Sequence, residues 1–266
     1  MSAYIVDTET TNRKPPLEII EAAWIKLPMA ADLTGDDPDL IPDLGPVNLY
    51  RAVLNRYCER FKPSVPITFG SMAVHHILPQ ELENCRPSAE FQLPDDCTYI
   101  CGHSIDFDWQ AIGCPQVKRI CTHAMAQHVY PDATGYSQSA LIYMLEGTHD
   151  HVRQMLRQAH GAGADVQMNA LLLWHILKDM PTPINRWSAL WEFSEECRIP
   201  RTCPMKRYEG VPLAELDLGF VDWCLAQHWL DPYFRKGLER VVKQREAAYY
   251  AQTDTDRDEE REDVPW

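Results

Sequence analysis

The stretch AYIVDTETT, residues 3–11, joins an apolar run to two acids and predicts a buried strand at the centre of the fold. Side chains two residues apart in a strand point to the same face, so we expect Asp7 and Glu9 side by side at the strand's end. Neighbouring carboxylates repel each other unless one is protonated, a basic group pairs with them, or a divalent cation such as Mg²⁺ or Mn²⁺ binds. A simpler interpretation stays open, in which the strand ends in a polar turn capped by Thr8, Thr10 and Thr11.

The composition is that of a globular protein with a sizeable core. The chain has 266 residues, of which 45% are hydrophobic, and a formal net charge of −14. Five of these negative charges come from the last stretch, TDTDRDEEREDVPW, which has seven acids and two arginines. The acidity argues against binding nucleic acid by general electrostatic attraction, although acids can also serve as metal ligands.

Cysteine usage and hydropathy bear on location. The nine cysteines are scattered and form no Cys-x-x-Cys pair, so we expect reduced thiols and no structural zinc site. No apolar run approaches the ~20 residues of a membrane helix, and no basic segment followed by a signal core opens the chain. A cytoplasmic location is the resulting expectation.

The order of patterns predicts an α/β fold, with strands early and helices later. Residues 28–46, rich in Asp, Pro and Gly, are predicted to form an exposed loop. The predicted strands are residues 4–9, 17–27, 47–55, 98–103 and 119–122. The predicted helices are residues 123–130, 137–147, 150–159 and 164–180.

More acids lie farther along the chain. Asp106 and Asp108 follow the fourth predicted strand, where a ligand site and a helix N-terminus that favours acids are both reasonable interpretations. His160 precedes a glycine-rich turn, and Asp165 lies on the first turn of the next amphipathic helix. A loop-to-helix transition at this turn would let His160 lean over a site that contains Asp165, whereas an isolated loop histidine is more often simply solvated.

The order and spacing of these residues resemble the DEDD exonuclease superfamily, in the DEDDh (DnaQ-like) branch, whose last motif contains a histidine. The motifs are DTET at 7–10, GHSIDFD at 102–108, and His160 with Asp165. Within this branch the chain is most similar to the exonuclease X family, since residues 61–78, 120–141 and 192–241 also match. The likeness covers nearly all of residues 1–250.

The resemblance implies a ribonuclease H-like α/β domain with a mixed five-stranded sheet flanked by helices, which removes nucleotides from 3′ ends with two Mg²⁺ ions or with Mn²⁺ in their place. Matched motif by motif, the metal ligands would be Asp7, Glu9, Asp108 and Asp165, and His160 would be the general base. The match selects Asp108 over Asp106. Glu21 resembles a family acid to which we assign no catalytic role.

Chain-end binding would involve the pocket walls. Backbone amides near Thr10 and Thr11 are candidates for holding the terminal nucleotide. The aromatic candidates for base stacking are His76, Phe107, Trp109 and Tyr136, and burial in the core is the competing interpretation for them.

Three segments follow from this resemblance: an exonuclease domain at 1–180, a small, mainly helical C-terminal module at 181–250, and an acidic, disordered tail at 251–266.

In the module, MKRYEG at 205–210 departs from the family's Phe-Gly-Lys-x-Lys-Gly turn, which puts nucleic-acid contact by this turn in doubt. The basic helix after it fits either phosphate contact or an exposed amphipathic face. The EDVPW ending is similar to the acidic tips of bacterial single-stranded DNA-binding proteins, so Trp266 is either a plug for a basic pocket on a protein partner or part of a solubilising tail.

The predicted function is a metal-dependent 3′ to 5′ exonuclease that hydrolyses phosphodiester bonds of DNA, in single strands and at 3′ ends of duplexes. The alternatives are an RNA-trimming or oligoribonuclease-like enzyme and, from another class, a non-catalytic nucleic-acid-binding protein. The resemblance also leaves a homodimer open.

Overall fold

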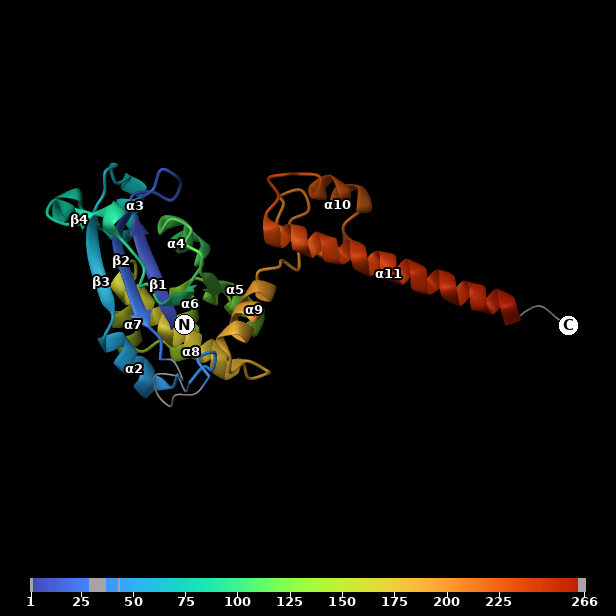
Figure 1. Cartoon of the computed structure of the whole chain (residues 1–266), viewed down its shortest axis with the longest axis horizontal. Coiled ribbons are helices and arrows are strands. Elements are labelled where there is room, and N and C mark those ends of the chain that lie inside the picture. The colour runs from blue at the N-terminus through green and yellow to red at the C-terminus, as the bar shows by residue number, and fades with distance from the viewer. Residues whose placement is uncertain (1, 29–36, 43, 263–266) are drawn as a thin grey trace. The chain divides into compact units, whose positions relative to one another are not determined.

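The computed structural model describes residues 2–28, 37–42 and 44–262 and, for 252–262, the backbone alone. The chain divides into two compact units, Met1–Cys197 and Arg198–Trp266, which are considered separately (Figure 1). Within the described residues there is no helix with the length and apolar character needed to span a membrane.

The first unit is built on a mixed sheet whose strand order is β4-β3-β2-β1-β5-β6. β1 pairs antiparallel with β2 and parallel with β5, so it lies inside the sheet. The expected mixed sheet flanked by helices is confirmed, but it has six strands, because a two-residue strand extends the edge beside β3. The strands are β1 Ser2–Thr10, β2 Ile19–Lys26, β3 Tyr57–Lys62, β4 Arg86–Pro87, β5 Cys97–Gly102 and β6 Lys118–Cys121.

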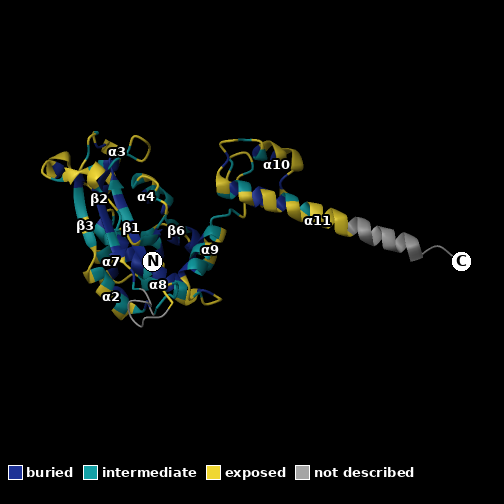
Figure 2. Ribbon diagram, in the orientation of Figure 1, coloured by how far each residue is buried: buried dark blue, intermediate teal, exposed yellow. Residues whose placement is uncertain are grey.

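Helices cover both faces of this sheet. Ala3 and Ile5 pack in the large core beneath α8, whereas Val6 packs with Ile105 on the opposite face. Burial on both faces explains why the first strand reads as a continuous apolar run (Figure 2). The helices of this unit are α2 Pro46–Leu54, α3 Phe69–His75, α4 Asp106–Ala111, α5 Thr122–Val129, α6 Gln138–Glu146, α7 Asp150–Leu156, α8 Ala162–Asp179 and α9 Trp187–Cys197.

The prediction of a strand at 47–55 was wrong, because this segment is helix α2. Pro46 occupies its first turn, where the missing N–H costs nothing, and the helix buries Leu49 against the core. The third strand is instead Tyr57–Lys62. It lies near a sheet edge, and its charged residues obscure the alternation of apolar and polar side chains that would identify a strand. The other four predicted strands and the four predicted helices are present, with small shifts of their ends.

Two segment boundaries differ from the sequence prediction. The first unit ends at Cys197 rather than 180, because Trp187 and Leu190 of α9 are buried in its core. The second unit contains α10 Leu218–Leu225 and α11 Pro232–Glu262, so the predicted disordered tail is helical as far as Glu262. No glycine interrupts residues 238–262, and Glu, Arg, Ala and Gln there favour a helix. The tip that ends in Trp266 and most of the predicted loop at 28–46 lie outside the described residues.

Candidate metal centre

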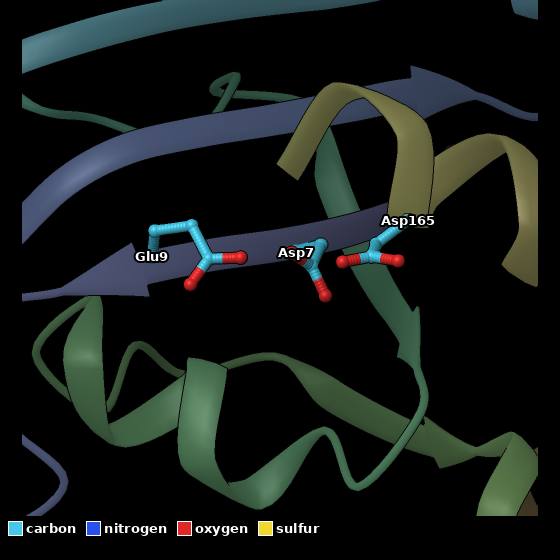
Figure 3. A group of neighbouring side chains, drawn as sticks. All are labelled: Asp7, Glu9 and Asp165. Carbon is cyan, nitrogen blue, oxygen red and sulfur yellow. The ribbon is translucent and has the colours of Figure 1, made fainter. Parts of the chain in front are cut away.

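The alternation of β1 determines the first half of the site. Asp7 and Glu9 continue the face that buries Ile5, so both carboxylates project toward the start of α8. Oxygens of Asp7, Glu9 and Asp165 all lie within 4.8 Å of one another, and Figure 3 shows two of these side chains on the strand and the third on the helix. Residues more than 150 positions apart thus form one carboxylate cluster.

The turn before α8 fixes the position of Asp165. The backbone N–H of His160 donates to Asp165 Oδ2 at 3.0 Å, and Gln138 Nε2 donates to the carbonyl oxygen of Asp165 at 3.0 Å. His160 has a left-handed backbone with φ of +67° and an exposed side chain. Since α8 begins at Ala162, His160 precedes the helix, as the predicted loop-to-helix transition requires.

Asp108 approaches the end of β1 from α4. It is 4% exposed, and its Oδ1 accepts hydrogen bonds from Thr8 N at 2.8 Å and Thr8 Oγ1 at 2.7 Å. Asp106 instead accepts a hydrogen bond from Arg119 at 2.6 Å. Of the two acids, Asp108 is therefore the one held beside the carboxylate cluster.

Burial and mutual repulsion raise the pKa values of these carboxyls. Burial is the largest cause in each case, followed for Asp7 by the charge of Asp108 and for Glu9 by that of Asp165. The pKa of Glu9 rises to about 9, that of Asp108 to about 7 and that of Asp165 to about 6, while the pKa of Asp7 rises well above its usual value. A bound cation would favour ionisation of all four acids by compensating their charge, and carboxylate oxygens are the donors that Mg²⁺ and Mn²⁺ prefer.

Glu21 is a site residue whose role was not evident from the sequence. It stands opposite Glu9 in the pairing of β1 with β2 and is 7% exposed. Its Oε2 accepts from the backbone N–H of Ala162 at 2.8 Å, and its Oε1 accepts from Arg60 Nε at 3.0 Å. Glu21 therefore ties the first turn of α8, and with it Asp165, to the sheet.

Two of the predicted stacking residues, Trp109 and Tyr136, already have partners within the protein. Trp109 Nε1 donates to the carbonyl oxygen of Pro115 at 2.9 Å, and Arg119 lies 4.1 Å from the centre of its ring system. The hydroxyl of Tyr136 donates to the carbonyl oxygen of Tyr130 at 2.8 Å, and its ring packs against the core. Both rings are thus engaged by the protein itself.

The remaining predicted substrate contacts lie at the end of β1, at the end of α3 or on α4. Thr10 is buried, and Thr11 is fully buried with its N–H donating to the carbonyl oxygen of Glu18 at 2.9 Å, so the Thr11 amide is already paired. His76 is exposed at the left-handed end of α3, and Phe107 is half-buried on α4. His76 and Phe107 remain accessible candidates.

Comparisons with known proteins give likenesses in structure alone. No protein-family model matches the chain, and no curated protein sequence matches it. Exonuclease X in complex with 5′ overhanging duplex DNA has 19% identity and a TM-score of 0.48, over 71% of this chain and 99% of that chain. The nuclease domain of 3′hExo, a DEDDh family member bound to rAMP, has 13% identity and a TM-score of 0.44, over 67% and 92%. A 3′-exonuclease in specific recognition of the 3′ end of histone mRNA stem-loop has 12% identity and a TM-score of 0.44, over 67% and 82%. Likenesses of this size assign neither a family nor an activity to the chain.

Proposed function

We propose that this protein is a metal-dependent 3′ to 5′ exonuclease of the DEDDh type, with DNA as its favoured substrate. The observation that supports this most is the convergence of Asp7, Glu9 and Asp165, with Asp108 beside them and His160 bonded to Asp165. The four carboxyls and the histidine are the residues that occupy the motif positions in the sequence.

The carboxylates suit the binding of two divalent cations. Asp7, Glu9, Asp108 and Asp165 would hold Mg²⁺ or Mn²⁺, which when bound supply charge neutralisation at the scissile phosphate and acidify a water. The raised pKa values of these carboxyls support this proposal, because a bound positive charge would make their full ionisation favourable. The end of β1 supplies a rigid base for this arrangement, because Thr8 holds Asp108 through two hydrogen bonds.

His160 is suited to accept a proton from the attacking water. Its backbone N–H donates to Asp165 Oδ2, which places the residue beside the carboxylates, and its side chain is exposed. A histidine imidazole is the commonest side chain in the role of general base.

Substrate preference is a finer part of the proposal. DNA is favoured by the motif resemblance to the exonuclease X family, and RNA trimming is the second candidate. The solved structures with similar folds are described with duplex DNA, with rAMP and with an mRNA stem-loop, so both nucleic acids belong in the test.

The test is an incubation of 5′-labelled single-stranded DNA, overhanging duplex DNA and RNA with Mg²⁺. We expect the wild type to shorten DNA stepwise and Asp7→Ala to leave it intact. Asp106→Ala is the matched control, because its carboxylate pairs with Arg119 rather than facing the cluster. Shortening that persists in Asp7→Ala would contradict the proposal, and binding without shortening of any strand would favour a non-catalytic protein.

A further inference from the structure

The second unit has a row of four aromatic rings, in which Phe220 is buried, Tyr208 is half-buried, and Trp223 and Trp229 are exposed. Neighbouring ring centres are 4.3 Å, 6.0 Å and 6.1 Å apart along this row. A pocket of about 480 Å³ opens along the first three rings and is also lined by Arg207.

The core of the unit does not account for the two exposed tryptophans. That core contains Phe220, Val221 and Cys224 of α10 with Leu238 of α11, and Trp223 and Trp229 do not belong to it. Trp223 is 48% exposed and Trp229 is 54% exposed, and Figure 2 shows the exposed face of α10. Two large aromatic side chains therefore lie in water beside a pocket, which is a common feature of binding surfaces.

One end of the row is held rigidly before any ligand arrives. Asp217 caps α10 by accepting from Phe220 N at 2.8 Å, and the hydroxyl of Tyr208 donates to Asp217 Oδ2 at 3.0 Å. These bonds fix the Tyr208 and Phe220 end of the row, so a ligand that stacks there loses little affinity to ordering the protein.

The charge of the two units identifies the kind of ligand. Residues 1–197 have 14 basic and 25 acidic residues, whereas residues 198–250 have nine basic and seven acidic residues. The whole second unit is also acidic, with 11 basic and 14 acidic residues, because its last stretch adds seven acids and two arginines. A polyanionic strand is repelled by acidic surface, so residues 198–250, which contain the aromatic row and are slightly basic, are the part of the chain better suited to add affinity. Arg207 supplies a cation at the pocket itself, with its guanidinium 5.3 Å from the centre of the Tyr208 ring.

The basic helix α11 contributes less of this charge than its sequence suggests. Arg235 donates to the carbonyl oxygens of Leu225 and Gln227, and Arg245 donates to those of Ala214 and Leu216. These arginines secure the ends of α10 and the loop before it. The aromatic row with Arg207 is therefore a better candidate than α11 for contact with nucleic acid.

We infer that the aromatic row binds the unpaired bases of a single-stranded nucleic acid by stacking, with Arg207 contacting its phosphates. Every base offers a flat face to Trp223 and Trp229, so this binding is tolerant of sequence. That the bound strand is also the strand being cleaved rests on the proposed function, whereas the binding itself does not.

The experiment measures binding of fluorescein-labelled oligothymidylate and oligouridylate to the full chain in EDTA, by fluorescence anisotropy. We expect Trp223→Ala with Trp229→Ala to weaken the Kd about tenfold or more, since stacking contributes about 1–3 kcal/mol per base. The corresponding double phenylalanine variant retains flat rings and should bind within about threefold of the wild type. Tyr249→Ala is the matched control, because Tyr249 is 67% exposed on α11 but does not line the pocket.

Circular dichroism establishes that the double alanine variant is folded. If that folded variant binds the oligonucleotides as tightly as the wild type does, the inference is overturned. It is also overturned if the wild type binds neither oligonucleotide, even if the wild type binds a proline-rich peptide instead. Stacking-dependent binding without any cleavage in Mg²⁺ defeats the proposed nuclease and leaves this inference standing. If the wild type cleaves DNA in Mg²⁺ but the double alanine variant binds the oligonucleotides as tightly as the wild type does, the proposed nuclease stands and this inference fails.

Discussion

Replacing Glu21 with alanine separates a structural support from the proposed metal ligands. Glu21 bonds to the N–H of Ala162 at 2.8 Å and to Arg60 at 3.0 Å, and does not belong to the three-residue carboxylate cluster. The substitution leaves a fully buried amide without its acceptor at the first turn of α8. Asp165 lies on the next part of that turn, so we expect its carboxylate to lose its fixed position.

The magnitude follows from these contacts. A hydrogen bond to a charged group contributes about 1.5–3 kcal/mol, and an orphaned buried donor costs about 1–3 kcal/mol. Loss of a partner that orients a metal ligand reduces metal affinity or activity about 10–100-fold, or about 1.4–2.8 kcal/mol. The two ranges agree, so the single contact to Ala162 can account for the expected loss. The ion pair with Arg60 adds little, because Arg60 is 40% exposed.

The assay combines Mn²⁺ titration by electron paramagnetic resonance with kcat/KM on single-stranded DNA. Glu81→Ala is the control, since Glu81 also bonds to Arg60, at 2.6 Å, but is 42% exposed. Glu21→Gln keeps an acceptor for Ala162 without the charge and should recover most of the activity. If Glu21→Ala binds Mn²⁺ and cleaves as well as Glu81→Ala does, the supporting role of Glu21 is refuted.

Three further predictions concern the site. Because the folded pKa of Glu9, about 9, lies above its unfolded value, the metal-free protein binds protons that the unfolded chain releases, and its stability falls as pH rises from about 5 to 9. Saturating Mg²⁺ should remove that fall in stability. Thermal unfolding at pH 6 and pH 8.5, in EDTA and in Mg²⁺, measures the fall and its removal, and a metal-free Tm that rises with pH would contradict the prediction. Asp108→Ala should reduce kcat at least ~100-fold while Asp106→Ala changes it less than ~3-fold, and equal effects would mean that the wrong acid was chosen. His160→Ala should lower kcat about 10²–10⁴-fold and remove the acidic limb of the pH–rate profile with Mn²⁺ affinity retained, and an unchanged profile would exclude its role as base.

Much of the fold was predictable because its central elements have strong local signals. The apolar run before Asp7 is buried on both faces, and α6 ends at Gly147, whose φ is +82°. Helix α2 was mistaken for a strand because its exposed face also contains apolar residues, with Val47 66% and Tyr50 64% exposed. A segment with apolar residues on both faces loses the periodicity that distinguishes helix from strand.

The candidate site residues were predictable only where a local sequence pattern places the side chain. Asp7 and Glu9 follow from strand alternation, and Asp165 from its place at the start of a helix. The role of Glu21 depends on a hydrogen bond to an amide 141 positions away, which no local pattern encodes. Its one sequence signal was an acid in the middle of an otherwise apolar strand, where an unpaired charge is costly.

The most direct test of the nuclease proposal is to follow one DNA strand labelled at its 5′ end and the same strand labelled at its 3′ end, in parallel, with Mg²⁺. We expect the 3′ label to be released at once as a mononucleotide, while the 5′ label moves down a ladder of single-nucleotide steps. Both events should stop in EDTA and in Asp7→Asn. Internal fragments as the first products, release of the 5′ label first, or cleavage that survives Asp7→Asn would contradict the proposal.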